Sequence, residues 1–136
     1  MSVNVPNEGE ILFLQYALGL AAASDLQLRL YSNNVTASDF VTHGSFNEVT
    51  VAGYTAVGLT MAGWTVTLTG VSPTLAATAL YTAQTFNFTT GATVYGYYVT
   101  SPGNTEVMWY EEFTSGPFVI PSGGGNITLA VRFKAS

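Results

Sequence analysis

The chain has 136 residues and a net charge of -5, and charged residues make up only 8% of it, compared with about 25% in a typical soluble domain. Hydrophobic residues make up 48%. Three basic residues cannot form the positive face that nucleic-acid binding requires, and an aromatic content of 13% argues against intrinsic disorder. Without cysteine there can be no disulfide, thiolate nucleophile or cysteine metal ligand. This length predicts one domain spanning residues 1–136.

The first predicted element is a helix over residues 7–20. Asn7 resembles an N-cap, because Glu10 follows three residues later as in a capping box, and Gly19 favours the end of the helix. The alternative for the apolar run 11–23 is a signal peptide or membrane anchor. The residues before this run include two acidic and no basic side chains, and the run is shorter than the roughly 18 apolar residues of a membrane span. We therefore expect a docked helix and no membrane partner.

This helix is apolar on nearly every side. Ile11, Leu14 and Leu18 share one face, with Leu12 and Tyr16 beside them. A helix of this kind needs cover on several sides, and a neighbouring subunit could supply what one small sheet does not. We therefore predict that Ile11, Leu14 and Leu18 lie at a contact between subunits.

From residue 25 onward the hydrophobic period becomes two, which predicts a β-sandwich over residues 25–136. Residues 26–31 and 64–69 alternate most clearly. The other candidate strands are residues 46–51, 54–60, 78–89, 94–101, 106–113, 118–120 and 127–134. About eight strands with turn residues between them are typical of a sandwich, and a jelly-roll-like topology is the first expectation. The predicted fold class is mainly β: an antiparallel β-sandwich with a short N-terminal helix.

Catalytic patterns are weak in this sequence. His43 lies near Asp39 and Ser45, but the members of a catalytic triad come from separate elements, which favours an ordinary loop histidine. Glu111 and Glu112 are neighbours on a predicted strand, so they point to opposite faces and cannot flank one bond as a catalytic pair. A cross-strand ion pair is favoured for one of them, with Arg29, Arg132 or Lys134 as the partner. No metal or phosphate motif is found, so we expect no enzyme activity, no metal and no cofactor.

Aromatic side chains leave two interpretations open. They could form a platform for sugar rings, or they could fill a core or a subunit interface. The residues concerned are Trp64, Tyr95, Tyr97, Tyr98, Trp109 and Tyr110. Both faces of residues 94–101 and 106–113 are apolar, which is typical of strands covered on both sides. We favour an interface through Tyr97, Trp109 and Tyr110, because interfaces are enriched in these residue types.

Three segments of the second half carry a resemblance to known proteins: VYGYYVTS (94–101), EVMWYEEF (106–113) and TSGPFVIPSGGGNITL (114–129). Together with the opening VPNEGE and its apolar helix, they resemble small virion proteins of tailed bacteriophages, and most of all capsid decoration (cement) proteins. The resemblance implies a β-sandwich that forms a homo-oligomer, commonly a trimer, and clamps neighbouring copies of the major capsid protein on the capsid surface. It implies no catalytic residues. The low charge differs from decoration proteins that hold the shell through salt bridges.

The expected function is therefore that of a non-enzymatic viral structural protein that stabilises a phage capsid by burying apolar surface. The predicted contact residues are Ile11, Leu14, Leu18, Tyr97, Trp109 and Tyr110. The alternative is a receptor- or glycan-binding β-sandwich module of a phage tail or fibre.

Overall fold

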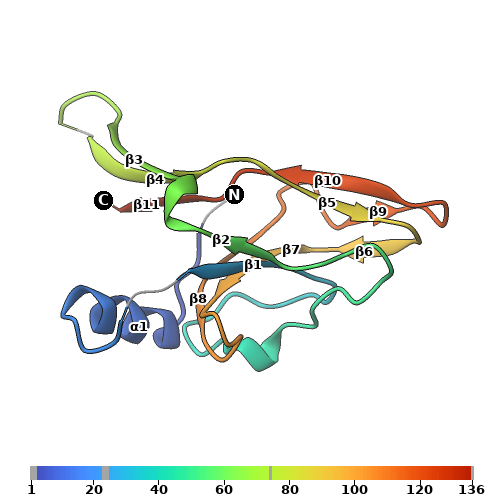
Figure 1. The fold of residues 1–136 in the computed structure, drawn as a ribbon, viewed down its shortest axis with the longest axis horizontal. Helices are drawn as coiled ribbons and strands as arrows, with labels where there is room; N and C mark the ends of the chain where they lie inside the picture. The colour runs from blue at the N-terminus through green and yellow to red at the C-terminus, as the bar shows by residue number, and fades with distance from the viewer. Residues whose placement is uncertain (1–2, 23–24, 74, 136) are drawn as a thin grey trace.

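Antiparallel β-sheets in two layers and one N-terminal helix make up the protein (Figure 1). The computed structural model describes residues 3–22, 25–73 and 75–135. The helix α1 spans Asn7–Ala17. The strands are β1 (Leu26–Tyr31), β2 (Val57–Leu59), β3 (Trp64–Thr69), β4 (Ala76–Tyr81), β5 (Gln84–Phe88), β6 (Ala92–Val94), β7 (Gly96–Thr100), β8 (Val107–Glu112), β9 (Phe118–Ile120), β10 (Gly125–Leu129) and β11 (Arg132–Ala135). The prediction of a mainly β fold with a short N-terminal helix is confirmed.

The first layer is a four-stranded sheet with the strand order β2-β1-β7-β8. Leu28 and Leu30 of β1 lie opposite Val99 and Tyr97 of β7, and Val99 lies opposite Trp109 of β8. Residues opposite each other in antiparallel strands share a face of the sheet. These five side chains are at most 3% exposed and belong to the main core, which lies between the two layers.

Residues 32–56, the long connection between β1 and β2, are called the cover segment below, because Val35, Val41 and Phe46 of this segment cover the outer face of the sheet (Figure 1). Its later residues Val49, Val51 and Tyr54 pack with the main core. Phe46 stacks on Tyr98 with ring centroids 4.5 Å apart and meets Tyr31 and Tyr110 edge-on at 5.0 and 5.2 Å. These rings form a second buried cluster. The strands β7 and β8 are therefore covered on both faces by the chain itself.

The prediction of a strand over residues 46–51 is wrong. This segment makes one isolated β-bridge, between Glu48 and Tyr31, and otherwise crosses the sheet as a cover. The next prediction, residues 54–60, shortens to the three residues of β2. Apolar side chains of residues 46–51 are nevertheless buried, Phe46 in the second cluster and Val49 in the main core, so this segment looks like a strand although it forms no ladder.

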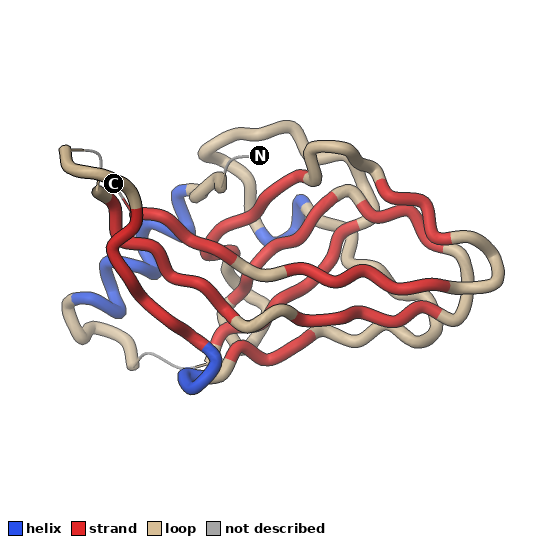
Figure 2. Tube along the Cα trace, turned by 90° about the horizontal axis from the view of Figure 1, so that it is seen from above, coloured by secondary structure: helices blue, strands red, loops and turns tan. Residues whose placement is uncertain are grey.

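The second layer consists of long strands that run along the molecule (Figure 2). A three-stranded sheet, β11-β4-β3, forms one part, and the pair β10-β5 forms another. Each of the predicted strands 78–89, 94–101 and 127–134 is divided between two strands, so eleven strands replace the expected eight or so. The first division has a physical reason. Tyr81 and Phe86 both enter the core, and an unbroken alternation would place them on opposite faces.

The helix α1 begins differently from the prediction. Pro6, not Asn7, is the N-cap, and no side chain caps this end. The backbone N–H of Asn7 instead donates to the carbonyl of Asp39 at 2.8 Å, which ties the helix to the cover segment. The other end agrees with expectation, because Leu18 is the C-cap and Gly19 has a positive φ of 70°. Residues 23–24, where the apolar run ends, lie outside the described residues.

A narrow face of α1 docks on β8. Only Gly9 and Leu12 of the helix are buried. A Cβ atom on Gly9 would lie 2.2 Å from the carbonyl oxygen of Met108, so only glycine allows this approach. Beside it, Glu8 Oε1 accepts hydrogen bonds from the backbone N–H of Val107 at 2.6 Å and of His43 at 2.9 Å. The expectation that the sheet covers little of this helix holds for the described residues.

Candidate functional site

The three helix residues predicted to contact another subunit lie on the surface. The exposed fractions of Ile11, Leu14 and Leu18 are 57%, 62% and 70%. Leu20, just after the helix, is also exposed. Nothing in the described chain covers this patch, so these side chains are available to a partner.

The three aromatic residues predicted for the same interface are buried instead. Tyr97 and Trp109 belong to the core between the layers, and Tyr110 lies under the cover segment. Their exposed fractions are 2%, 3% and 1%. Strands apolar on both faces are indeed covered on both sides, but the cover comes from the same chain. We therefore correct this part of the prediction: these side chains cannot reach a partner in this conformation.

A second exposed apolar patch lies on the hairpin of β3 and β4, called the arm below (residues 64–81). Val66 lies opposite Ala79, and Leu68 lies opposite Ala77. Phe133 of β11 lies opposite Ala79 as well, so one face of this sheet is apolar across three strands. Near the body of the molecule, the Phe133 ring packs against Trp109 at 5.1 Å. Farther out, the same face is bare, with Val66 and Leu68 exposed.

The two patches lie at the same end of the molecule, with the arm above α1 in the view of Figure 1. We call them together the assembly surface. Its members are Ile11, Leu14, Leu18 and Leu20 of the helix region, and Val66, Leu68, Val71 and Leu75 of the arm. Large exposed apolar patches mark interaction sites on soluble proteins. The clear alternation of residues 64–69 could have signalled the arm patch, because it predicts one apolar face that needs cover.

A groove of about 770 Å³ lies along β10 and β11 and faces β8. Its lining residues are Val3, Tyr97, Glu111, Phe113, Phe118, Ile127, Thr128, Leu129, Ala130, Arg132 and Lys134. On the groove side, β10 and β11 have no pairing strand among the described residues, since β10 pairs only with β5 and β11 only with β4. The sequence interpretation missed this groove. The signal available was Arg132 and Lys134, two of only three basic residues, alternating in one strand.

A buried pair, Tyr97 and Glu111, forms one wall of the groove. The Tyr97 hydroxyl donates a hydrogen bond to Glu111 Oε1. Burial raises the pKa of this hydroxyl far above its ordinary value, and the hydrogen bond and negative charge of Glu111 raise it further. Tyr97 therefore remains a protonated donor. We expected Glu111 or Glu112 to form an ion pair with a basic residue. Glu111 does not form it, because its partner is Tyr97.

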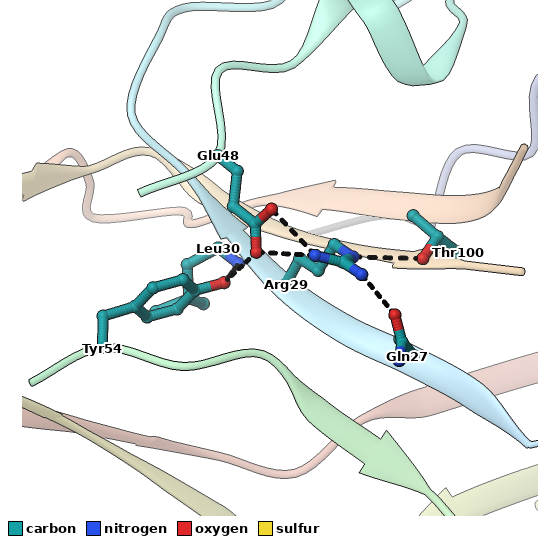
Figure 3. A network of polar contacts seen from close by, with 6 residues as sticks. All are labelled: Gln27, Arg29, Leu30, Glu48, Tyr54 and Thr100. Atoms are coloured by element: carbon teal, nitrogen blue, oxygen red, sulfur yellow. Dashed lines mark hydrogen bonds and ion pairs between the residues drawn. The ribbon is translucent and has the colours of Figure 1, made fainter. Parts of the chain in front are cut away.

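The third basic residue, Arg29, belongs to a polar network on the outer face of the first layer (Figure 3). Its guanidinium lies 2.8 Å from the Glu48 carboxylate and also donates to Gln27 and Thr100. Tyr54 donates to the same carboxylate at 2.9 Å and accepts a hydrogen bond from a β1 backbone N–H. This network fastens the cover segment to β1. It neutralises Arg29 internally and leaves no unpaired charge for a ligand.

The remaining chemical candidates stay apart. His43 lies in a short 3-10 turn, and no interaction joins its imidazole to Asp39 or Ser45 among the described residues. Glu111 is buried and Glu112 exposed, as expected for neighbours on a strand. The described residues contain no cluster of three or more histidine, aspartate or glutamate side chains that could hold a metal ion. Within the same residues, no helix has the length and apolar character needed to cross a membrane.

Comparisons of the chain with protein-family models, with curated proteins and with solved structures found no match in any of the three. Two features of the described residues bear on function. One is the assembly surface, which can bury apolar area against a partner. The other is the groove, which combines an apolar wall, a buried carboxyl group and two basic side chains.

Proposed function

We propose that the protein is a non-enzymatic structural protein of a phage virion, which binds the capsid shell as a homo-oligomer and stabilises it through apolar contacts. The observation that carries the proposal is the assembly surface at one end of the molecule. The resemblance of residues 94–129 to capsid decoration proteins supplies the partner, the major capsid protein.

The physical basis is the burial of exposed apolar side chains. Each Å² of apolar surface removed from water contributes about 25 cal/mol. Leu14 and Leu68 offer side chains that the chain itself leaves in water. An oligomer that contacts several shell subunits at once gains further strength, because the second and third contacts form within one complex. With only 8% charged residues, the chain has few side chains that could form salt bridges with a shell.

The test compares two substitutions on neighbouring positions of β3. Leu68→Lys places a charge on the apolar face, whereas Thr67→Lys places the same charge on the opposite, polar face of the same strand. Size-exclusion chromatography with light scattering gives the oligomeric state, and co-sedimentation with purified capsid shells that lack the protein gives binding. We expect the unmodified protein and Thr67→Lys to form oligomers and bind shells, and Leu68→Lys to lose both properties. An unmodified protein that is monomeric and ignores shells would overturn the proposal.

A second candidate function is a receptor- or glycan-binding module of a phage tail or fibre. The aromatic platform first considered for it is largely buried, because Tyr97, Tyr98, Trp109 and Tyr110 are each at most 3% exposed. The groove along β10 and β11 favours this candidate instead, since it is open and offers both polar groups and aromatic rings. Binding of the protein to a glycan array tests it independently of the shell experiment.

A further inference from the structure

The positive charge that the chain has available is concentrated at the groove. Of its three basic side chains, Arg29 is held by Glu48, whereas Arg132 and Lys134 line the groove. Both groove residues are exposed, and neither forms an ion pair with an acidic side chain of the described residues. In a protein with a net charge of -5, these two residues place positive charge at positions two apart on one strand, where it can attract an anionic ligand.

A hydrogen-bond acceptor lies in the wall of the same groove. Glu111 is 5% exposed, and its Oε1 atom accepts the hydrogen bond from Tyr97. The second carboxyl oxygen, Oε2, has no hydrogen-bond partner in the described chain, yet it is not among the fully enclosed polar atoms. Since Glu111 lines the groove, Oε2 is placed to accept a hydrogen bond from a ligand hydroxyl or amine.

Aromatic and aliphatic side chains complete the walls. Phe118 is 39% exposed and packs against Phe113 with ring centroids 5.0 Å apart. Ile127 and Leu129 extend the apolar wall along β10, with Thr128 between them. A volume of about 770 Å³ falls within the range of small-molecule sites, roughly 300 to 1,000 Å³.

We propose that this groove binds an acidic saccharide, a sugar chain that carries carboxylates. Its carboxylate pairs with Arg132 and Lys134, a sugar hydroxyl donates to Glu111 Oε2, and the apolar face of a sugar ring packs on Phe118. This inference rests on the second candidate function and names its ligand class. It is independent of the proposal of shell binding, which concerns apolar contacts at the assembly surface.

An acidic peptide fits the groove less well. An added peptide strand would need the free backbone groups of β11, as in strand addition to a sheet edge. The Tyr97 hydroxyl lies beside the backbone N–H of Arg132 and so occupies part of the edge with which an added strand would pair. A saccharide needs only the side chains.

Isothermal titration calorimetry with trigalacturonate as the acidic probe and galactotriose as the neutral probe tests the proposal. We expect trigalacturonate to bind more than tenfold more tightly than galactotriose, with affinity that falls as salt concentration rises. Arg132→Gln and Lys134→Gln each remove one charge-assisted contact at an exposed position, so each should weaken binding about tenfold. Glu112→Gln, an exposed neighbour on β8, is the control and should leave the affinity unchanged.

The outcomes separate the ligand class from the broader function. Equal affinity for the two probes, or no effect of either basic substitution, overturns the acidic class while leaving glycan binding in place. Failure of both probes, together with an empty glycan array, overturns glycan binding as well. Tight binding of triglutamate without binding of trigalacturonate overturns the saccharide in favour of an acidic peptide. Circular dichroism of each variant confirms that its fold is kept.

Discussion

Buried tyrosine hydroxyls connect the stability of this protein to pH. Burial raises the pKa of Tyr31, Tyr54, Tyr97 and Tyr98 above the ordinary value of 10.0. In the unfolded chain these hydroxyls lose their protons at about pH 10, while in the folded protein they keep them. Above that pH the unfolded state binds fewer protons than the folded state. The free energy of unfolding must then fall as pH rises, whereas below about pH 9 these groups have no effect on it.

Urea unfolding at several pH values measures this dependence. From about pH 9 to about pH 11 we expect the free energy of unfolding to fall by at least about 1 kcal/mol, since a tenfold change in the proton affinity of one group corresponds to about 1.4 kcal/mol. The ultraviolet absorbance of tyrosinate should appear together with unfolding rather than before it. Equal stability at the two pH values would contradict the burial of these hydroxyls.

Gly9 provides a second prediction at the scale of a residue. Alanine is a better helix former than glycine by about 1 kcal/mol, but its Cβ atom would lie 2.2 Å from the Met108 carbonyl oxygen. The clash exceeds the gain in propensity, so we expect Gly9→Ala to lower the free energy of unfolding by about 2 kcal/mol. Gly58→Ala is the matched control, because nothing lies within 4 Å of a Cβ atom there. Similar stabilities of the two variants in thermal unfolding would show that α1 does not approach β8 so closely.

Among the elements, the cover segment of residues 32–56 buries the outer face of the first layer. Phe46 contacts three buried tyrosine rings, and its own exposed fraction is 7%. Phe46→Ala should therefore cost about 3 to 5 kcal/mol of stability in urea unfolding. Phe40 lies in the same segment but is 84% exposed, so Phe40→Ala should change stability by less than about 0.5 kcal/mol. Equal effects of the two substitutions would contradict the described cover.

The elements also show what sequence alone could predict. Residues 26–31 and 64–69 alternate strictly and form strands where expected, because period two places every second side chain on one face. Residues 46–51 have similar composition but form a cover, since an apolar side chain looks the same whether its backbone pairs or merely crosses a sheet. The aromatic residues of β7 and β8 were correctly expected to be covered. Sequence could not tell cover by residues 32–56 from cover by a neighbour, because both bury the same side chains.

Of the two candidate sites, the sequence predicted one and missed the other. Exposed apolar residues of α1 were predicted, because an all-round apolar helix exceeds what one sheet can cover. The groove was not predicted, because it brings Glu111 of β8 beside Arg132 and Lys134 of β11, and strand order is not encoded in periodicity.

For the whole molecule, the proposal of self-association predicts that thermal stability depends on concentration. An oligomer that forms only from folded chains stabilises them by mass action, so its melting temperature rises with protein concentration. We expect this rise in the unmodified protein and its loss in Leu14→Lys, whose side chain lies on the assembly surface. Scanning calorimetry at several concentrations measures it. A melting temperature that is the same at all concentrations would contradict self-association.

The arm has a consequence for how the molecule moves. Five of the six β3 residues are exposed and the sixth is half-buried, whereas every residue of β7 is buried. Amide hydrogens held by few buried contacts exchange through local opening, without unfolding of the rest. In the free chain, amides of β3 should thus exchange with deuterium much faster than those of β7. Under the proposed function, the segment that meets the neighbour is held less firmly by its own chain than β7 is, and assembly would complete its folding.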